Sequence, residues 1–479
     1  MKKLQDFLNS VISDNNIYAF LLFLSLFIIV FAKNEVFILP HHDDVTHASI
    51  AKRMVETNNY FEMYEGKDLS FLKPPLYFWL EAVCFKVFGI NDYSARFPSA
   101  MLGFLTILLA YLITKKLFDE NTSLFFLFIT LTSFYFLKFA KQAMLDMPVA
   151  FSTTLAIYSF TNIEFYNRKI FYILFAIAVA SGYYFKAIQG LYPIFIVIFY
   201  FILTDNFKKI FSKEFLLSLL FIFLLILLWI FPQYLKFGDT FFYSQCGIGP
   251  VINRGIEGQT GKFYQPFLKL IGLNLPWGII NLYGIYVLFR DMKFSQNQKN
   301  KFILILSWFF VILLILSLSK TFYLRYLIPL YVPYSILGAI GLKKICEGSI
   351  FLLKKIFFLL ILSIWSIFLI LPISPYYYKG TNYFDMYQVI KNLNIDTTKI
   401  IIFKEKYYKL NQGLSYYSSI IPSGYVKDGN ELLEKSNPDY TYVSSYKNLT
   451  DLLNNKEFNK KINIIAFSKN NDWAIFNIK

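Results

Sequence analysis

The sequence is poor in charged residues and in cysteine. Asp, Glu, Lys and Arg make up only 16% of its 479 residues, against about 25% in an average soluble domain. The three cysteines, Cys84, Cys246 and Cys346, are far apart and form no CxxC pair, which excludes a disulfide framework and a zinc ribbon. Glycine (21) and proline (16) are too few for a collagen-like or low-complexity chain.

Apolar and aromatic residues are abundant instead. Hydrophobic residues make up 56% of the chain, with 55 Phe and 36 Tyr, and so much apolar surface needs a non-aqueous environment. The net charge of +16 does not indicate nucleic-acid binding, because Lys and Arg collect in the cytoplasmic loops of membrane proteins. We therefore expect a polytopic α-helical membrane protein with membrane lipids, and no nucleic acid, as partners.

Long apolar runs predict about eleven transmembrane helices. A spanning helix needs roughly 20 mostly apolar residues, because the hydrocarbon layer is about 30 Å thick. The runs lie at about 17–32, 96–114, 121–137, 147–163, 170–185, 188–204, 215–232, 267–289, 302–318, 326–341 and 356–373. No small-x-small cleavage site follows the first run, so we expect an uncleaved anchor.

The short loops predict the orientation in the membrane. If Lys2 and Lys3 are inside, every second loop is a compact basic cluster, such as Lys115-Lys116 and Lys343-Lys344, as the positive-inside rule requires. The long loops 33–95 and 233–266 and the tail then face outward. This pattern predicts a multi-pass inner-membrane protein with a cytoplasmic N-terminus and a periplasmic tail.

The tail differs in character from the rest of the chain. Residues 1–373 hold the apolar runs, whereas residues 374–479 hold short β-rich segments at 399–403, 440–444, 462–467 and 473–478, with helical patterns at 384–393 and 448–454. Alternating short strands and helices predict a small soluble α/β domain of about 100 residues.

The first outer loop carries paired acids before a helical pattern. Asp43 and Asp44 precede apolar positions Ile50 and Met54 at helical spacing. An acidic side chain near a helix N-terminus interacts favourably with the exposed N–H groups and contributes roughly 0.3–1 kcal/mol. Helix stabilisation alone would therefore explain Asp43 and Asp44. The functional alternative is a carboxylate that faces a cavity at the membrane surface and acts as a general base.

Lys73 lies directly before Pro74-Pro75. Proline is tolerated in the first turn of a helix, so a helix should start here. An ammonium beside exposed helix N–H groups could bind phosphate. The alternative is a lysine that reaches to the membrane interface.

Asp146 stands at the edge of an apolar run, where an unpaired carboxylate is costly. Lys141 is the nearest candidate partner, and it is also a candidate substrate-binding residue. Several cations on one membrane face could clamp a phosphate, although each alone is typical of an interfacial anchor. The further outer-side cations are Lys186, Arg254, Lys320 and Arg325.

These motifs occur in one order that resembles a known family. Asp43-Asp44, Lys73-Pro74-Pro75-Leu76, Asp146-Met147-Pro148 and Ser319-Lys320 with Arg325-Tyr326 resemble the membrane glycosyltransferases of the GT-C fold. The chain is most similar to bacterial relatives of protein O-mannosyltransferases and of the lipid A aminoarabinose transferase, over about residues 17–345. The resemblance implies a polyprenyl-phosphate sugar donor, and a lipid A-like glycolipid or a protein as acceptor.

The resemblance also implies roles for single residues. Asp43 matches the acid that activates the acceptor, and Asp146 matches a second carboxylate near the active site. Lys73 matches the lysine that contacts the donor phosphate. The substrate-binding candidates are Asp44, Lys73, Lys141, Lys186, Arg254, Lys320 and Arg325.

Metal binding is the point on which the chain departs from these relatives. Leu72 and a loop 233–266 without histidine stand where the aminoarabinose transferases carry metal ligands. Asp43 and His47, four residues apart, would share a helix face and form a two-ligand candidate. We expect a reaction that needs no cofactor, with a divalent metal as the alternative.

Together these features predict an inverting glycosyl transfer at the outer face of the membrane, with Asp43 as the base. The alternative is a transporter or flippase of lipid-linked sugars, which would need a charged pathway across the midplane.

Overall fold

The computed structural model describes most of the chain outside some loops and parts of the tail. The described residues are 14–32, 42–66, 68–71, 73–245, 261–290, 295–319, 321–350, 354–360, 395–403, 414–417, 423–434, 437–467 and 473–478, with a few isolated positions between them. Contacts divide the chain into two units. The first comprises residues 1–34, 71–77 and 96–375, and the second comprises 35–70, 78–95 and 376–479.

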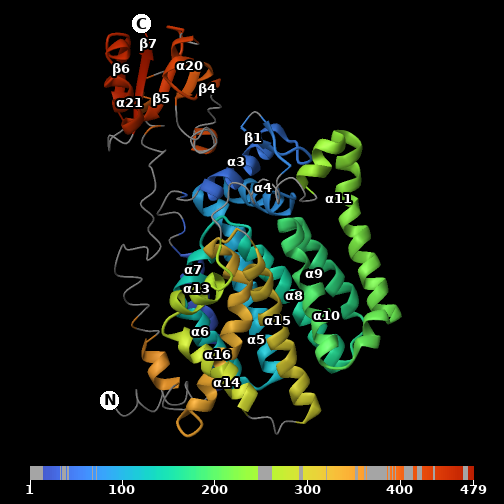
Figure 1. Ribbon diagram of the computed structural model, residues 1–479. Coiled ribbons are helices and arrows are strands. Elements are labelled where there is room, and N and C mark those ends of the chain that lie inside the picture. The colour runs from blue at the N-terminus through green and yellow to red at the C-terminus, as the bar shows by residue number, and fades with distance from the viewer. Residues whose placement is uncertain are drawn as a thin grey trace. The chain divides into compact units, whose positions relative to one another are not determined.

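The first unit is helical (Figure 1). Its α-helices are α2 (Asn15–Phe31), α5 (Asp92–Leu117, which starts in the second unit), α6 (Glu120–Leu131), α7 (Phe134–Ala140), α8 (Asp146–Tyr166), α9 (Phe171–Lys186), α10 (Tyr192–Leu203), α11 (Lys213–Gln245), α13 (Gln265–Leu273), α14 (Trp277–Arg290), α15 (Gln296–Leu318) and α16 (Ile328–Ile345). Short 3₁₀ turns are η1 (Ala187–Leu191), η2 (Phe207–Phe211) and η3 (Leu324–Leu327).

Five helical segments of the described chain are long and apolar enough to cross a membrane, or up to seven if each bent pair is one span. The five are Asp92–Leu117, Phe171–Leu203, Lys213–Ser244, Gln296–Leu318 and Leu324–Ile345. The bent pairs are α6 with α7, at 71°, and α13 with α14, at 117°. The predicted number of eleven stays a prediction, and most of the run 356–373 lies outside the described residues.

Helix α16 lies at the centre of this unit and α11 at its edge. The most apolar window of the α16 segment is 89% buried, whereas that of α11 is 22% buried. Helix α16 packs against α6, α8, α14 and α15. A Cβ added at Gly284 would lie 1.8 Å from the Leu337 carbonyl oxygen, so the backbones of α14 and α16 touch, as at many membrane helix interfaces.

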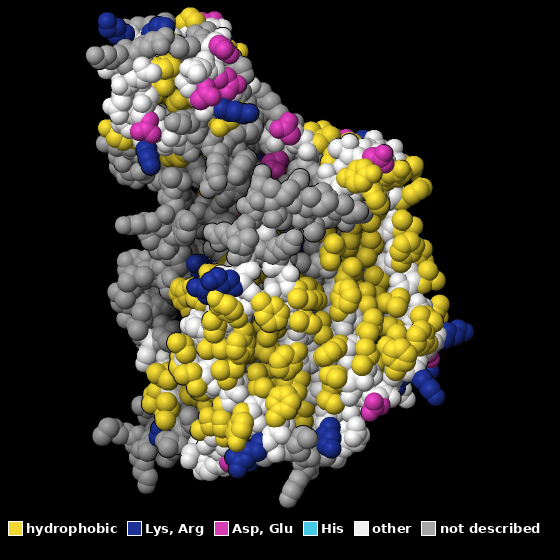
Figure 2. All heavy atoms as spheres, in the orientation of Figure 1, with side chains coloured by type: hydrophobic (Ala, Val, Ile, Leu, Met, Phe, Trp, Pro, Cys, Tyr) yellow, Lys and Arg dark blue, Asp and Glu magenta, His cyan; other side chains and the backbone are white. Residues whose placement is uncertain are grey.

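The surface of the unit fits a bilayer. Figure 2 shows the apolar side chains of one face as a broad yellow field, with Lys and Arg side chains at its borders, along the lower edge, at the right and in a group at the upper left. Such a field is expected where lipid rather than water covers the protein.

The second unit combines two distant parts of the chain. Its first part holds α3 (His42–Thr57), a hairpin of β1 (Tyr64–Glu65) and β2 (Asp68–Leu69), and most of α4 (Leu76–Phe88). The start of α3 at the paired acids, and of α4 after Pro75, agrees with the sequence prediction.

The tail part of this unit contains a five-stranded sheet in the order β4-β3-β5-β7-β6. Strand β3 runs parallel to β4 and β5, and the other pairs are antiparallel. The elements are η4 (Thr397–Lys399), β3 (Ile400–Phe403), β4 (Gly424–Val426), α20 (Gly429–Glu434), β5 (Thr441–Ser445), α21 (Tyr446–Leu453), α22 (Lys456–Asn459), β6 (Ile462–Phe467) and β7 (Trp473–Ile478).

Four of these strands were predicted within one residue, and β4 is additional. The predicted helix 448–454 corresponds to α21, and half of the predicted helix 384–393 lies outside the described residues. The soluble character of the tail and the domain boundary at residue 373 stay predictions.

Candidate active site

Asp146 forms the centre of a buried charged cluster in the first unit. It begins α8 and is only 3% exposed. The Lys186 Nζ lies 2.5 Å from Asp146 Oδ1, and the Arg325 Nε lies 3.7 Å from Oδ2. A buried carboxylate is costly without such partners. The cluster therefore brings together three of the predicted residues from three separate segments.

The chain reverses directly after Lys186, and this reversal places the lysine. Ala187 has φ 50° and ψ −128°, which ends α9. A Cβ added at Gly190 would lie 1.9 Å from the Gly182 carbonyl carbon, so η1 folds back onto α9. Lys186 at the C-terminus of α9 and Asp146 at the N-terminus of α8 also match the helix dipoles.

Two tyrosines line the cations of the cluster. The Arg325 Cζ lies 4.9 Å from the ring centre of Tyr323 and 5.7 Å from that of Tyr326, and the Lys186 Nζ lies 4.3 Å from the Tyr326 ring. Aromatic faces attract cations. One carboxylate and two cations give these three charged side chains a net charge of +1.

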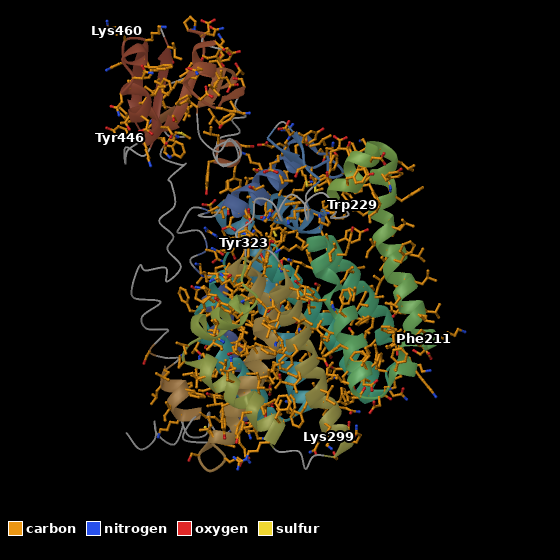
Figure 3. The ribbon with its side chains drawn as sticks, viewed as in Figure 1. Phe211, Trp229, Lys299, Tyr323, Tyr446 and Lys460 are labelled. Carbon is orange, nitrogen blue, oxygen red and sulfur yellow. The ribbon has the colours of Figure 1, made fainter. Side chains whose placement is uncertain are left out.

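The cluster lies at one end of the helical unit. Figure 3 shows Tyr323 at one end of this unit and Lys299 at the other, with the helices between them. Lys299 lies in the first turn of α15, and Tyr323 directly precedes η3. The start of α15 and the segment before η3 therefore lie at opposite ends of the helical unit.

The paired acids lie in the second unit, in the first turn of α3. Asp43 is half-buried and Asp44 is fully buried. His47 is buried as well, and its ring centre lies 5.6 Å from that of Phe78. Asp43 is therefore the more accessible of the two carboxylates.

Glu81 is a buried acid that was not predicted from the sequence. It is fully buried on α4, and neither of its carboxyl oxygens has a hydrogen-bond partner among the described residues. Burial, and to a lesser degree the charge of Asp44, raise the pKa of Glu81 well above its usual range. Burial and Glu81 also raise the pKa of Cys84 to about 11. A single acid within the apolar run 76–88 was the available signal.

Lys73 lies in the first unit, half-buried and three residues before the start of α4. Its segment is held against α11, because the Phe71 ring centre lies 5.0 Å from that of Phe237 and 5.6 Å from that of Phe241.

Lys141 directly follows α7 in the chain, and its side chain reaches the C-terminal end of α2. Its Nζ donates to the carbonyl oxygens of Ile29, at 2.9 Å, and Ala32, at 2.6 Å. The ion pairs described for Asp146 are with Lys186 and Arg325 rather than with Lys141, the partner expected from sequence. Arg254 and Lys320 lie outside the described residues.

Metal ligands do not cluster in the described part of the chain. No group of three or more His, Cys, Asp or Glu side chains there is arranged to hold a metal ion. Asp43 and His47 stay a two-ligand candidate on α3.

The chain matches known glycosyltransferases in sequence. Residues 72–231, a third of the chain, match the dolichyl-phosphate-mannose-protein mannosyltransferase family. The undecaprenyl phosphate-alpha-4-amino-4-deoxy-L-arabinose arabinosyl transferase 1 of Proteus mirabilis is 26% identical over 329 residues, which is 67% of this chain and 58% of that protein. The chain thus spans less than two thirds of this relative.

The fold matches solved structures over nearly the whole chain. ArnT from Cupriavidus metallidurans, solved with undecaprenyl phosphate, superposes with a TM-score of 0.74 over 96% of this chain and 97% of that one, at 13% identity. The chain has the GT-C fold. The oligosaccharyltransferase of Archaeoglobus fulgidus gives a TM-score of 0.60 over 90% of this chain and 68% of its own, at 14% identity.

The family match covers only part of the site in this GT-C chain. It includes Lys73, Lys141, Asp146 and Lys186, and it begins after α3 and ends before Arg325.

Proposed function

We propose that the chain is an inner-membrane glycosyltransferase. It moves a sugar from a polyprenyl-phosphate donor to a lipid A-like glycolipid or to a protein, at the outer face of the membrane. The single observation that carries the proposal is the buried Lys186–Asp146–Arg325 cluster within a GT-C fold. The match to transferases of polyprenyl-linked sugars supports it and does not favour a flippase.

The leaving phosphate is neutralised by cations. When the bond between the anomeric carbon and the phosphate oxygen breaks, the electron pair stays on the phosphate. Fixed cations in a water-poor site stabilise this developing charge strongly. Lys186 and Arg325 are fixed by Asp146, and Lys73, Lys320 and Arg254 are the further cations of this proposal.

Asp43 is the general base. The acceptor hydroxyl oxygen attacks the anomeric carbon from the face opposite the phosphate, and its proton passes to the Asp43 carboxylate. Attack from the opposite face inverts the configuration of the sugar. The partial exposure of Asp43 suits contact with an acceptor, whereas Asp44 is fully buried.

The reaction as proposed does not require a metal. Lys and Arg side chains already balance the charge of the leaving phosphate, so no Lewis acid is needed to stabilise that charge. The alternative is a divalent ion at Asp43 and His47. If transfer depends on this ion, a chelator such as EDTA should abolish transfer.

A transfer assay with Asp43→Asn tests the proposal. Purified protein in nanodiscs is given a pool of radiolabelled polyprenyl-phosphate sugars and a total membrane extract. Loss of the general base should lower transfer by about 10²- to 10⁴-fold, with the binding of donor unchanged.

Asp68→Asn is the matched control, because Asp68 is an exposed carboxyl in the same unit. It should leave transfer unchanged. Substantial turnover by Asp43→Asn would remove Asp43 as the base, and the absence of any wild-type transfer would overturn the proposed function.

A further inference from the structure

Residues 414–417 form one short helical turn of the tail, here named the tail turn. Its first residue, Leu414, is 1% exposed and belongs to the apolar core on one face of the sheet. In that core it joins Ile400, Ile402, Val443, Trp473 and Ile475. The tail turn is therefore anchored in the sheet.

The next residues of the tail turn bind α3. The Lys52 Nζ donates to the Ser415 carbonyl oxygen at 3.1 Å and to the Tyr416 carbonyl oxygen at 2.7 Å. Lys52 is only 7% exposed, and its Nζ lies 3.7 Å from Glu56 Oε1. Burial lowers the pKa of Lys52, and Glu56 opposes this shift. An ammonium buried to this degree needs such acceptors.

The tail turn also contacts the segments on either side of α3. The Leu39 N–H donates to the Tyr417 hydroxyl oxygen at 2.8 Å, and that hydroxyl lies 3.3 Å from Asp92 Oδ2 at the start of α5. The Tyr416 ring centre lies 6.2 Å from that of Phe85 on α4. One turn thus joins α3, α4, the residue Leu39 before α3 and the first residue of α5, all within the second unit.

Directional bonds of this kind set the rotation of a helix as well as its position. Lys52 follows Asp43 by nine residues on the same helix, which is about 13 Å along a rigid axis. We propose that the tail positions the acceptor-activating helix α3 through the tail turn, with Lys52 as the positioning residue. This inference rests on the proposed function only in so far as Asp43 is the base.

Hydrogen exchange tests the contact without any need for turnover. Amides of α3 should exchange at least about tenfold faster in Lys52→Met, because loss of the buried bonds lowers the local opening free energy. Tyr417→Phe, a milder change, should raise exchange in the same helix. Lys447→Met removes an exposed lysine of the same unit and should leave α3 unchanged.

Kinetics then test the positioning role. A displaced base should lower kcat by about 10- to 100-fold, while the KM for donor stays within about twofold and Lys52→Arg restores most of the loss. Unchanged exchange of α3 in both Lys52→Met and Tyr417→Phe would overturn the inference and leave the proposed function intact. Faster exchange with unchanged kcat would overturn the positioning role, and inactive wild-type protein would overturn the proposed function instead.

Discussion

At the scale of single residues, Asp146 determines where two cations can lie. Lys186 and Arg325 come from segments far apart in the chain, and both reach the same carboxyl group. The side chains of Asp146 and Lys186 are 3% and 6% exposed. Removing one member of a buried pair leaves an uncompensated charge, which destabilises more than the pair itself stabilises.

Asp146→Asn should therefore destabilise the folded protein by about 3–5 kcal/mol. Thermal unfolding of the purified protein measures the effect. Glu214→Gln is the control, because it breaks an exposed ion pair with Lys169 and should leave the Tm nearly unchanged. An equal Tm for Asp146→Asn and wild type would contradict the buried cluster.

Glu81 should make stability dependent on pH. Its pKa is raised in the folded state by burial and by Asp44, whereas an unfolded Glu titrates at about 4.3. The folded state thus binds the proton more tightly. The stability contributed by protonated Glu81 is complete below the unfolded pKa and is lost as the pH rises towards the folded pKa.

Glu81→Gln removes this dependence. The Tm of wild type should fall more steeply between pH 5 and pH 8 than that of Glu81→Gln, measured in the same detergent. Asp68→Asn, at an exposed carboxyl, should follow the wild-type profile. Parallel profiles for wild type and Glu81→Gln would show that Glu81 is ionised when folded.

At the scale of elements, helix ends and reversals place the reactive side chains. Asp146 begins α8, Lys186 ends α9, and Arg325 lies in η3 before α16. The reversal after Lys186 needs glycine at two positions, because the backbones at Gly182 and Gly190 touch.

Gly190→Ala should prevent this close approach. Overpacking usually costs about 1–3 kcal/mol, and here the added Cβ would overlap backbone atoms, which cannot rotate away. We expect a lower Tm and a smaller monodisperse fraction in size-exclusion chromatography. Gly272→Ala on α13 has open space around its Cβ and should be neutral, so equal behaviour of the two variants would contradict the packing of η1 on α9.

Local sequence predicts elements better than it predicts partners. Strands β3, β5, β6 and β7 were predicted because alternation and β-branched runs are local signals. Asp146 was expected to be paired, but its partner Lys186 lies 40 residues further along the chain. The two side chains meet only because α8 packs on α9. Glu81 was missed because its burial also depends on tertiary contacts.

At the scale of the whole molecule, the proposed base and the cationic cluster belong to different units. The first contains the helices that can span a membrane and the cationic cluster. The second combines the helix that carries Asp43 with the sheet of the tail. Because the first outer loop and the tail share contacts such as Lys52 with Ser415, the tail belongs to the same folded unit as the proposed base.

The fate of the labelled sugar distinguishes a glycosyltransferase from a flippase. Wild-type protein in liposomes is supplied with radiolabelled polyprenyl-phosphate sugar and membrane extract, and label is followed in carrier, glycolipid and protein. We expect label to leave the carrier and to appear in glycolipid or protein. Label that stays on the carrier but crosses the bilayer would contradict a transferase and identify a flippase.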